Sequence, residues 1–211
     1  TLNRPEKRNA LNHALRGGII QALQQADEAP DIRVMIVRGA GKCFSAGYDL
    51  GGGNVGQELP WFTPGGEGHW PRHVTQGWMS IWELSKPVIA QVHGYCLAGG
   101  SELATCCDLV YMADDAQMGY PAVRFAVPDV HFHVWFVGMR KAMEMMLTGD
   151  PISGVEAARL GWANASFTSR SSCPAVSSSE SRSLGPSRTT RRWCSPTNRR
   201  PTSIRRISRR S

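Results

Sequence analysis

The sequence lacks an apolar run approaching the ~20 residues that a membrane-spanning helix needs. No secretory signal is expected, because residues 1–18 are polar and helix-like. None of the six cysteines has the spacing of a zinc site, and the adjacent Cys106 and Cys107 are poor disulfide partners. The cysteines therefore predict reduced thiols, as in a cytoplasmic protein, and no metal centre.

Lysine is absent from the end of the chain, and acidic residues are almost absent. Residues 166–211 hold 11 Arg, 14 Ser and 4 Pro, but no Lys and one acidic residue, so they carry a charge of +10. Residues 1–165 hold 13 basic and 16 acidic residues, a charge of −3, so the net charge of +7 comes entirely from the tail. We therefore expect one domain over residues 1–165 and a separate tail over 166–211.

The composition of this tail allows two interpretations. Arginine without lysine, beside serine and proline, is what a GC-rich gene yields when it is read in the wrong frame, so a frameshift near codon 165 is one hypothesis. A native disordered arm is the other. The absence of an initiator Met also predicts that residue 1 is not the native start.

Apolar periodicity predicts alternating helices and strands, and hence an α/β fold. Two helices are amphipathic: one over residues 12–27, and one over 135–147 whose apolar face is Phe136, Met139, Met143 and Met146. A helix over 70–84 is expected to pack Trp78 in the core. Strands are expected at 32–38, 87–92 and 108–113, an extended piece at 117–121, and a helix after Ser153.

Residues 93–104, HGYCLAGGSELA, organise the chain. They follow the β-branched strand at 87–92, and their glycines fall where the strand changes to a helix. Glycine there lets the backbone approach a ligand closely, and the first helical N–H groups are free to donate. Glu102 follows inside the first turn, so an acid–base group lies next to donors for a negatively charged oxygen.

A second glycine loop supplies the partner. Residues 42–50, KCFSAGYDL, follow the strand at 32–38 and its GAG turn. Two parallel strands that end in glycine loops bring two backbone N–H groups to one edge of a sheet, where they can hold an oxygen that becomes negative during a reaction.

These residues resemble the crotonase superfamily, the enoyl-CoA hydratases and isomerases. The similar motifs, which occur in family order along the chain, are Asn3–Pro5 with Asn9–Asn12, Phe44–Leu50, His93–Glu102, Asp108–Tyr111, and Leu147–Asp150 with Ala157–Gly161. The resemblance covers about residues 1–165. It implies the crotonase fold, in which repeated ββα units form a spiral sheet flanked by helices, and an enzyme that binds acyl-CoA thioesters.

The resemblance assigns roles by position. It makes the backbone amides of Tyr48 and Gly99 the oxyanion donors and Glu102 an acid–base group. It places the coenzyme A contacts at Ala10, Ala46, Tyr48, Leu50 and Gly99. Coenzyme A is then part of the substrate rather than a separate cofactor. Arg8 is expected near a phosphate, and Asp49 is expected to be structural.

One family residue is absent. A typical hydratase has a second glutamate 20 residues after the first, and here Gly119-Tyr120-Pro121 is followed by Ala122. An isomerase, a hydrolase or another lyase therefore fits the residues as well as a hydratase. Asp129 lies where some members, including haloaroyl-CoA dehalogenases, place a catalytic Asp, and its alternative role is a helix cap. His131 and His133 are expected to be solvated or packed.

The tail also bears on the expected assembly of the chain and on two alternative functions. Family members assemble as homotrimers or dimers of trimers through C-terminal helices, which the tail does not provide, so a truncated and catalytically crippled chain is a second hypothesis. RNA binding by the arginine-rich tail is a minor third, with only Phe167 and Trp193 available for base stacking. No membrane partner is expected.

Overall fold

The computed structural model describes residues 1–51, 76–124 and 133–168. Within them lies a parallel four-stranded sheet in the order β1-β2-β4-β7, formed by Met35–Arg38, Val88–Val92, Leu109–Ala113 and Ala165–Phe167. A smaller sheet, in the order β3-β5-β6, comprises Tyr95–Leu97, Gln117–Gly119 and Ile152–Ser153. The α/β class and the parallel pairing of the strands before the two glycine loops are confirmed.

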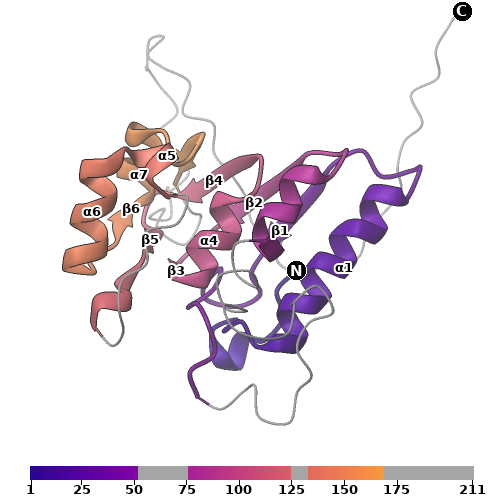
Figure 1. Ribbon diagram of the computed structural model, residues 1–211, viewed down its shortest axis with the longest axis horizontal. Coiled ribbons are helices and arrows are strands. Elements are labelled where there is room, and N and C mark those ends of the chain that lie inside the picture. Colours follow the sequence, from indigo (N-terminus) through magenta and orange to yellow (C-terminus); the bar gives the residue numbers. More distant parts are fainter. Residues whose placement is uncertain (52–75, 125–132, 169–211) are drawn as a thin grey trace, which may run out of the picture.

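Helices flank these sheets. In Figure 1, α1 (His13–Glu28) lies at one end, α5 (His133–Val137), α6 (Met139–Thr148) and α7 (Gly154–Leu160) lie at the other, and α4 (Gly99–Thr105) lies between them. The shorter helical segments are η1 (Pro5–Lys7), α3 (Gly77–Met79), η3 (Ser80–Glu83) and η4 (Pro121–Arg124). The site is built around the central helix α4.

The start of α1 shows why the sequence predicted it well. Asn12 is the N-cap, and its side-chain oxygen accepts a hydrogen bond from the Leu15 amide at 2.9 Å. Ile19, Ile20 and Leu23 form the buried stripe. Further along the chain, Ser153 caps α7 as predicted, and its hydroxyl accepts from the Glu156 amide at 3.2 Å.

The chain leaves the first sheet for the second at Gly94, between β2 and β3. Gly94 has φ of 55°, and a Cβ there would lie 2.2 Å from the Lys42 carbonyl oxygen. No other residue fits that approach. This crossing separates β3 from β2. The sequence had predicted that the strand at 87–92 is followed directly by the helix, without β3.

Two predicted helices differ from the structure. The expected helix over 135–147 is two helices, α5 and α6, because Gly138 with φ of 76° interrupts it. Within α6 the buried residues are Ala142, Met145 and Met146, whereas Met139 and Met143 are 61% and 37% exposed, so the predicted packed methionine face is wrong for those two. Of the helix expected at 70–84, the described part is the short α3 and η3.

The core lies between α1, the first sheet and α4. Its fully buried side chains include Phe44, Trp78, Val88, Ala90, Leu103 and Met112. The four cysteines in the described part of the chain, Cys43, Cys96, Cys106 and Cys107, are buried free thiols. No helix among the described residues is both long and apolar enough to cross a membrane.

Candidate active site

The two glycine loops lie against each other. Ser45 and Cys96 form a parallel bridge, in which the Ser45 amide donates to the Tyr95 carbonyl and the Leu97 amide donates to the Ser45 carbonyl, both at 3.0 Å. Gly47 has φ of 102°, and a Cβ there would lie 2.9 Å from the Ala98 side chain. The segments leading into Tyr48 and Gly99 therefore lie side by side.

Helix α4 begins directly at this junction. Its first internal hydrogen bond runs from the Glu102 amide to the Ala98 carbonyl at 3.0 Å, so the amides of Gly99 to Ser101 precede the hydrogen-bonded turn. Ala98, the N-cap, has φ of 46° and ψ of −122°, which are unusual for a residue with a side chain. The helix begins two residues earlier than predicted, and Glu102 lies in its first turn as expected.

Glu102 is fully buried and hydrogen-bonded to the other loop. Its Oε2 accepts a short hydrogen bond from the phenol of Tyr48. The phenol oxygen in turn accepts from the indole Nε1 of Trp78 at 3.0 Å. Glu102 and Tyr48, predicted as site residues, are therefore brought together, and Trp78 is an addition, since it was expected only to fill the core.

The ring of Tyr48 covers Gly99. A Cβ built on Gly99 would lie 2.6 Å from two carbons of that ring. Burial, followed by the negative charge of Glu102, raises the pKa of Tyr48 well above 10. The phenol is therefore protonated at neutral pH and can donate to the carboxylate.

A buried arginine from α1 completes the group. The guanidinium carbon of Arg16 lies 5.7 Å from the centroid of the Tyr48 ring, and the residue is 3% exposed. Burial lowers the pKa of Arg16 to about 10, although Tyr48 and Glu102 act to raise it. Arg16 was not predicted from the sequence. It lies four residues before the buried Ile20, on the same face of the helix, and this spacing could have indicated that Arg16 is buried.

The position of the missing second glutamate is apolar. Ala122 lies in η4 and is buried in a cluster with Ala98, Tyr120 and Met146. Ala98 directly precedes Gly99, so a methyl group stands on this side of the two loops where a typical hydratase has a carboxylate.

The remaining predicted residues are placed as follows. Asp129 and His131 lie outside the described residues. His133 is buried, its Nε2 lies 3.2 Å from the Ser101 hydroxyl, and its ring packs edge-on against Trp162, as expected for a packed histidine. Asp49 accepts from Arg4 at 2.9 Å and thereby fixes the loop, which fits a structural role.

The positions expected to contact coenzyme A lie on adjoining segments. Leu11 and Tyr48 form a parallel bridge, with the Leu11 amide donating to Gly47 at 2.7 Å. Ala10 and Ala46 flank this bridge, and Leu50 is 74% exposed at its end. The Ala46 amide donates to Arg8, so it is engaged within the protein. The structure thus brings these positions together, while their role stays a prediction.

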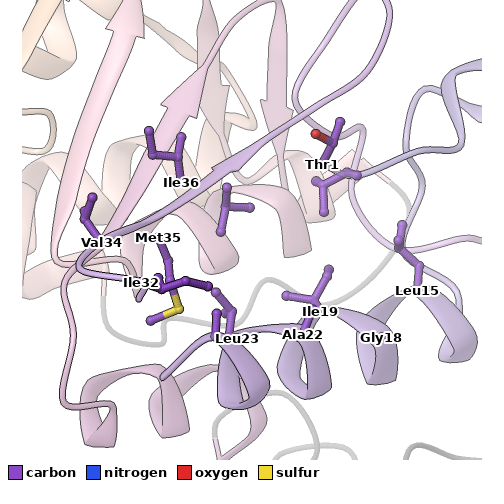
Figure 2. A pocket seen from close by; sticks show the side chains of 13 residues that line it. Thr1, Leu15, Gly18, Ile19, Ala22, Leu23, Ile32, Val34, Met35 and Ile36 are labelled. Carbon is purple, nitrogen blue, oxygen red and sulfur yellow. The ribbon is translucent and has the colours of Figure 1, made fainter. Parts of the chain in front are cut away.

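A separate apolar cavity of about 320 Å³ lies between α1 and β1 (Figure 2). Its lining includes Leu15, Ile19, Leu23, Met35 and Ile36, and no acidic or basic side chain. It contains none of the predicted site residues. Within the described ranges, no group of three His, Cys, Asp or Glu side chains is arranged to hold a metal ion.

Comparison with known proteins agrees with this architecture. A sequence model of the enoyl-CoA hydratase/isomerase family matches residues 1–171, and the chain belongs to that family. A protein of Mycobacterium leprae, described as a probable enoyl-CoA hydratase, is 35% identical over 165 residues, covering 76% of this chain and 61% of the relative. The mitochondrial enoyl-CoA hydratase of Pongo abelii is 35% identical over 164 residues, covering 76% and 54%.

Solved structures show the same fold. An enoyl-CoA hydratase/isomerase from Xanthobacter autotrophicus has a TM-score of 0.68 and 35% identity, covering 79% of this chain and 61% of that one. An enoyl-CoA hydratase from Mycobacterium smegmatis has a TM-score of 0.67 and 34% identity, covering 79% and 61%. The predicted crotonase fold is confirmed, and the chain spans about three fifths of the length of the curated relatives above.

Proposed function

We propose that this chain is an enzyme of the enoyl-CoA hydratase type, which binds an acyl-CoA thioester and stabilises its enolate. Coenzyme A enters as part of the substrate. Adding water to a 2-enoyl thioester places negative charge on the thioester oxygen. The amides of Tyr48 and Gly99 are the proposed donors to that oxygen, and two such donors at about 2.7–3.1 Å lower the barrier by several kcal/mol.

Glu102 is the proposed base. Its carboxylate takes a proton from water as the water oxygen bonds to the β-carbon of the enoyl group, and the electron pair of the double bond moves to the thioester oxygen. The observation that carries the proposal is the position of Glu102, buried in the first turn of α4, one turn after Gly99 and hydrogen-bonded to Tyr48 on the facing loop.

Isomerisation is the second candidate, and Ala122 is the observation that favours it. Moving a double bond needs one base that removes a proton and returns it, so a site with a single glutamate is sufficient. A hydrolase or dehalogenase using Asp129 would need a residue outside the described ranges. A catalytically crippled chain is less favoured, because the Tyr48 and Gly99 loops and Glu102 are assembled.

Replacing Glu102 by Gln tests the base. The change keeps the shape of the side chain and removes its charge, so we expect hydration of 2-butenoyl-CoA to fall by about 10²–10⁴-fold. Glu144→Gln is the control, because Glu144 is 61% exposed and pairs with Lys141 at the surface. Full activity in Glu102→Gln would refute the assignment. Supplying 3-butenoyl-CoA and identifying the product separates hydratase from isomerase.

Assembly and compartment belong to the same proposal. By family expectation the active protein is a homotrimer or a dimer of trimers in the cytoplasm. Light scattering of the purified chain gives its mass directly, and a monomer or an aggregate would contradict the trimer. RNA binding by the basic tail stays the minor alternative, to be tested by its salt dependence.

A further inference from the structure

Three side chains from three other segments lie around the Tyr48 side chain. Tyr48, from the loop after β1, donates to Glu102 of α4, and Trp78 of α3 donates to the Tyr48 oxygen at 3.0 Å. Arg16 of α1 lies 5.7 Å from the ring centroid. Trp78 and Arg16 are 2% and 3% exposed. Burying an arginine and an indole N–H beside a phenol is costly unless these groups have something to stabilise.

The arrangement suits an oxygen that becomes negative for part of a cycle. An indole N–H and a guanidinium both stabilise a phenolate, and both face Tyr48. Among the described residues, Nε and Nη1 of Arg16 have no hydrogen-bond partner, so the cation is not neutralised by a dedicated ion pair at those atoms. Its charge is therefore available to the Tyr48 and Glu102 pair.

The location also suits proton delivery to substrate. The Tyr48 ring lies against Gly99, whose amide is one proposed donor to the thioester oxygen, and the α-carbon of the substrate is two bonds from that oxygen. On the side where a typical hydratase holds its second carboxylate, Ala122 supplies only a methyl group. Tyr48 is the proton-bearing side chain that the structure places between Glu102 and Gly99.

We propose that the phenol of Tyr48 is the second acid–base group of this site, which protonates the substrate α-carbon while Glu102 activates water. This inference rests on the proposed hydratase function and makes Tyr48 a catalytic residue through its side chain. Arg16 and Trp78 are positioning residues that stabilise the transient phenolate.

Water gives a proton to the Glu102 carboxylate, and its oxygen bonds to the β-carbon. The enolate electron pair then takes the proton of the Tyr48 phenol, forming the α C–H bond and leaving a phenolate. The Glu102 carboxylic acid returns its proton to the phenolate along their existing hydrogen bond. The net change is addition of one water across the double bond, with both side chains restored.

The raised pKa of Tyr48 supports this direction of transfer. Burial and the Glu102 charge keep the phenol protonated at neutral pH, which is the form that an acid needs. A thioester enolate is a far stronger base at carbon than a phenolate, so the transfer is favourable even from a weakly acidic phenol.

The test compares Tyr48→Phe with Tyr111→Phe. The first keeps the ring over Gly99 and removes only the hydroxyl, and the second removes a phenol from β4, where Tyr111 packs against Phe167. For Tyr48→Phe we expect kcat for 2-butenoyl-CoA hydration to fall by about 10²-fold or more, with KM changed less than about threefold. Tyr111→Phe should keep the wild-type values.

A second measurement follows the α-proton alone. In reverse, the phenol gives its proton to Glu102 and the phenolate takes an α-proton from butyryl-CoA, so the wild type should introduce solvent deuterium at the α-carbon, visible by proton NMR. Tyr48→Phe should lose this exchange. A purely structural role for the hydroxyl would alter stability or KM and leave exchange at the wild-type rate.

The outcomes are distinct. If the wild type hydrates and exchanges but Tyr48→Phe does so equally well, this inference is overturned and the proposed function stands. If the wild type neither hydrates nor exchanges, the proposed function fails. Should Tyr48→Phe not fold, Trp78→Phe replaces it: a lowered kcat at unchanged KM supports the relay, and an unchanged kcat overturns it.

Discussion

Replacing Arg16 by Met should stabilise the fold while it weakens catalysis. Burial lowers the pKa of Arg16 from its ordinary value to about 10. That difference corresponds to about 3 kcal/mol of unfavourable free energy for holding the charge in the fold at neutral pH. Allowing for solvent screening, we expect Arg16→Met to raise the free energy of unfolding by about 1–2 kcal/mol. Met retains most of the aliphatic packing of the arginine stem.

In the proposed reaction the same charge is favourable. A cation 5.7 Å from the Tyr48 ring centroid attracts a negative charge there by about 3 kcal/mol at an effective dielectric constant of ~20. Since part of this is lost to relaxation, kcat for hydration should fall by about 10–100-fold in Arg16→Met. Stability and activity thus change in opposite directions in one variant.

Urea unfolding and thermal melting measure the first effect, and the melting temperature should rise by roughly 2–8 °C. Arg124→Met is the matched control, because Arg124 is 58% exposed and pairs with the exposed Asp150, so its removal should change stability by less than about 0.5 kcal/mol. A loss of more than 1 kcal/mol in Arg16→Met, well beyond the control, would refute the reasoning, since it would mean that the buried guanidinium is a net source of stability.

Three further predictions concern other parts of the fold. Asn9→Ala should lower the free energy of unfolding by about 2–4 kcal/mol in urea, because the buried amide donates to the Cys43 carbonyl at 2.9 Å and to a second carbonyl at 2.8 Å; a loss below 1 kcal/mol would contradict this. Gly99→Ala should lower kcat while the free energy of unfolding changes less, because its methyl group displaces the Tyr48 ring; a kcat equal to that of the wild type would show that the ring moves freely. Stability should fall as pH rises above 9, because burial raises the pKa of the Cys107 thiol and only the unfolded state then ionises. Cys107→Ala should remove about 1 kcal/mol of the loss between pH 9 and pH 10, measured by urea unfolding at the two pH values.

The fold was predictable where local pattern and tertiary structure agree. The β-branched run at 88–92 and the glycine turns identified the parallel strands, and Asn12 and Ser153 marked two helix starts. The strand β3 was not predicted, because three residues carry too little periodicity to be distinguished from the turn around them.

Only those residues of the candidate site that lie in continuous sequence motifs were predictable. Tyr48, Gly99 and Glu102 lie in two continuous motifs, so spacing was enough to propose them. Arg16 and Trp78 reach the same point from helices far away in the sequence, and the contacts that bring them there come from packing. The Tyr48 side chain was missed for the same reason, since the motif points to its backbone amide alone.

The unusual backbone of Ala98 has a consequence for how the site works. Three hydrogen bonds hold this residue: its amide donates to Gly119 at 2.9 Å, and its carbonyl accepts from the Glu102 amide at 3.0 Å and from the Ser101 hydroxyl at 2.7 Å. A non-glycine residue at φ of 46° costs about 1–3 kcal/mol, which these bonds offset when the protein folds. The direction of the following amide is therefore set before the proposed thioester substrate arrives, and its binding energy need not be spent on turning that amide.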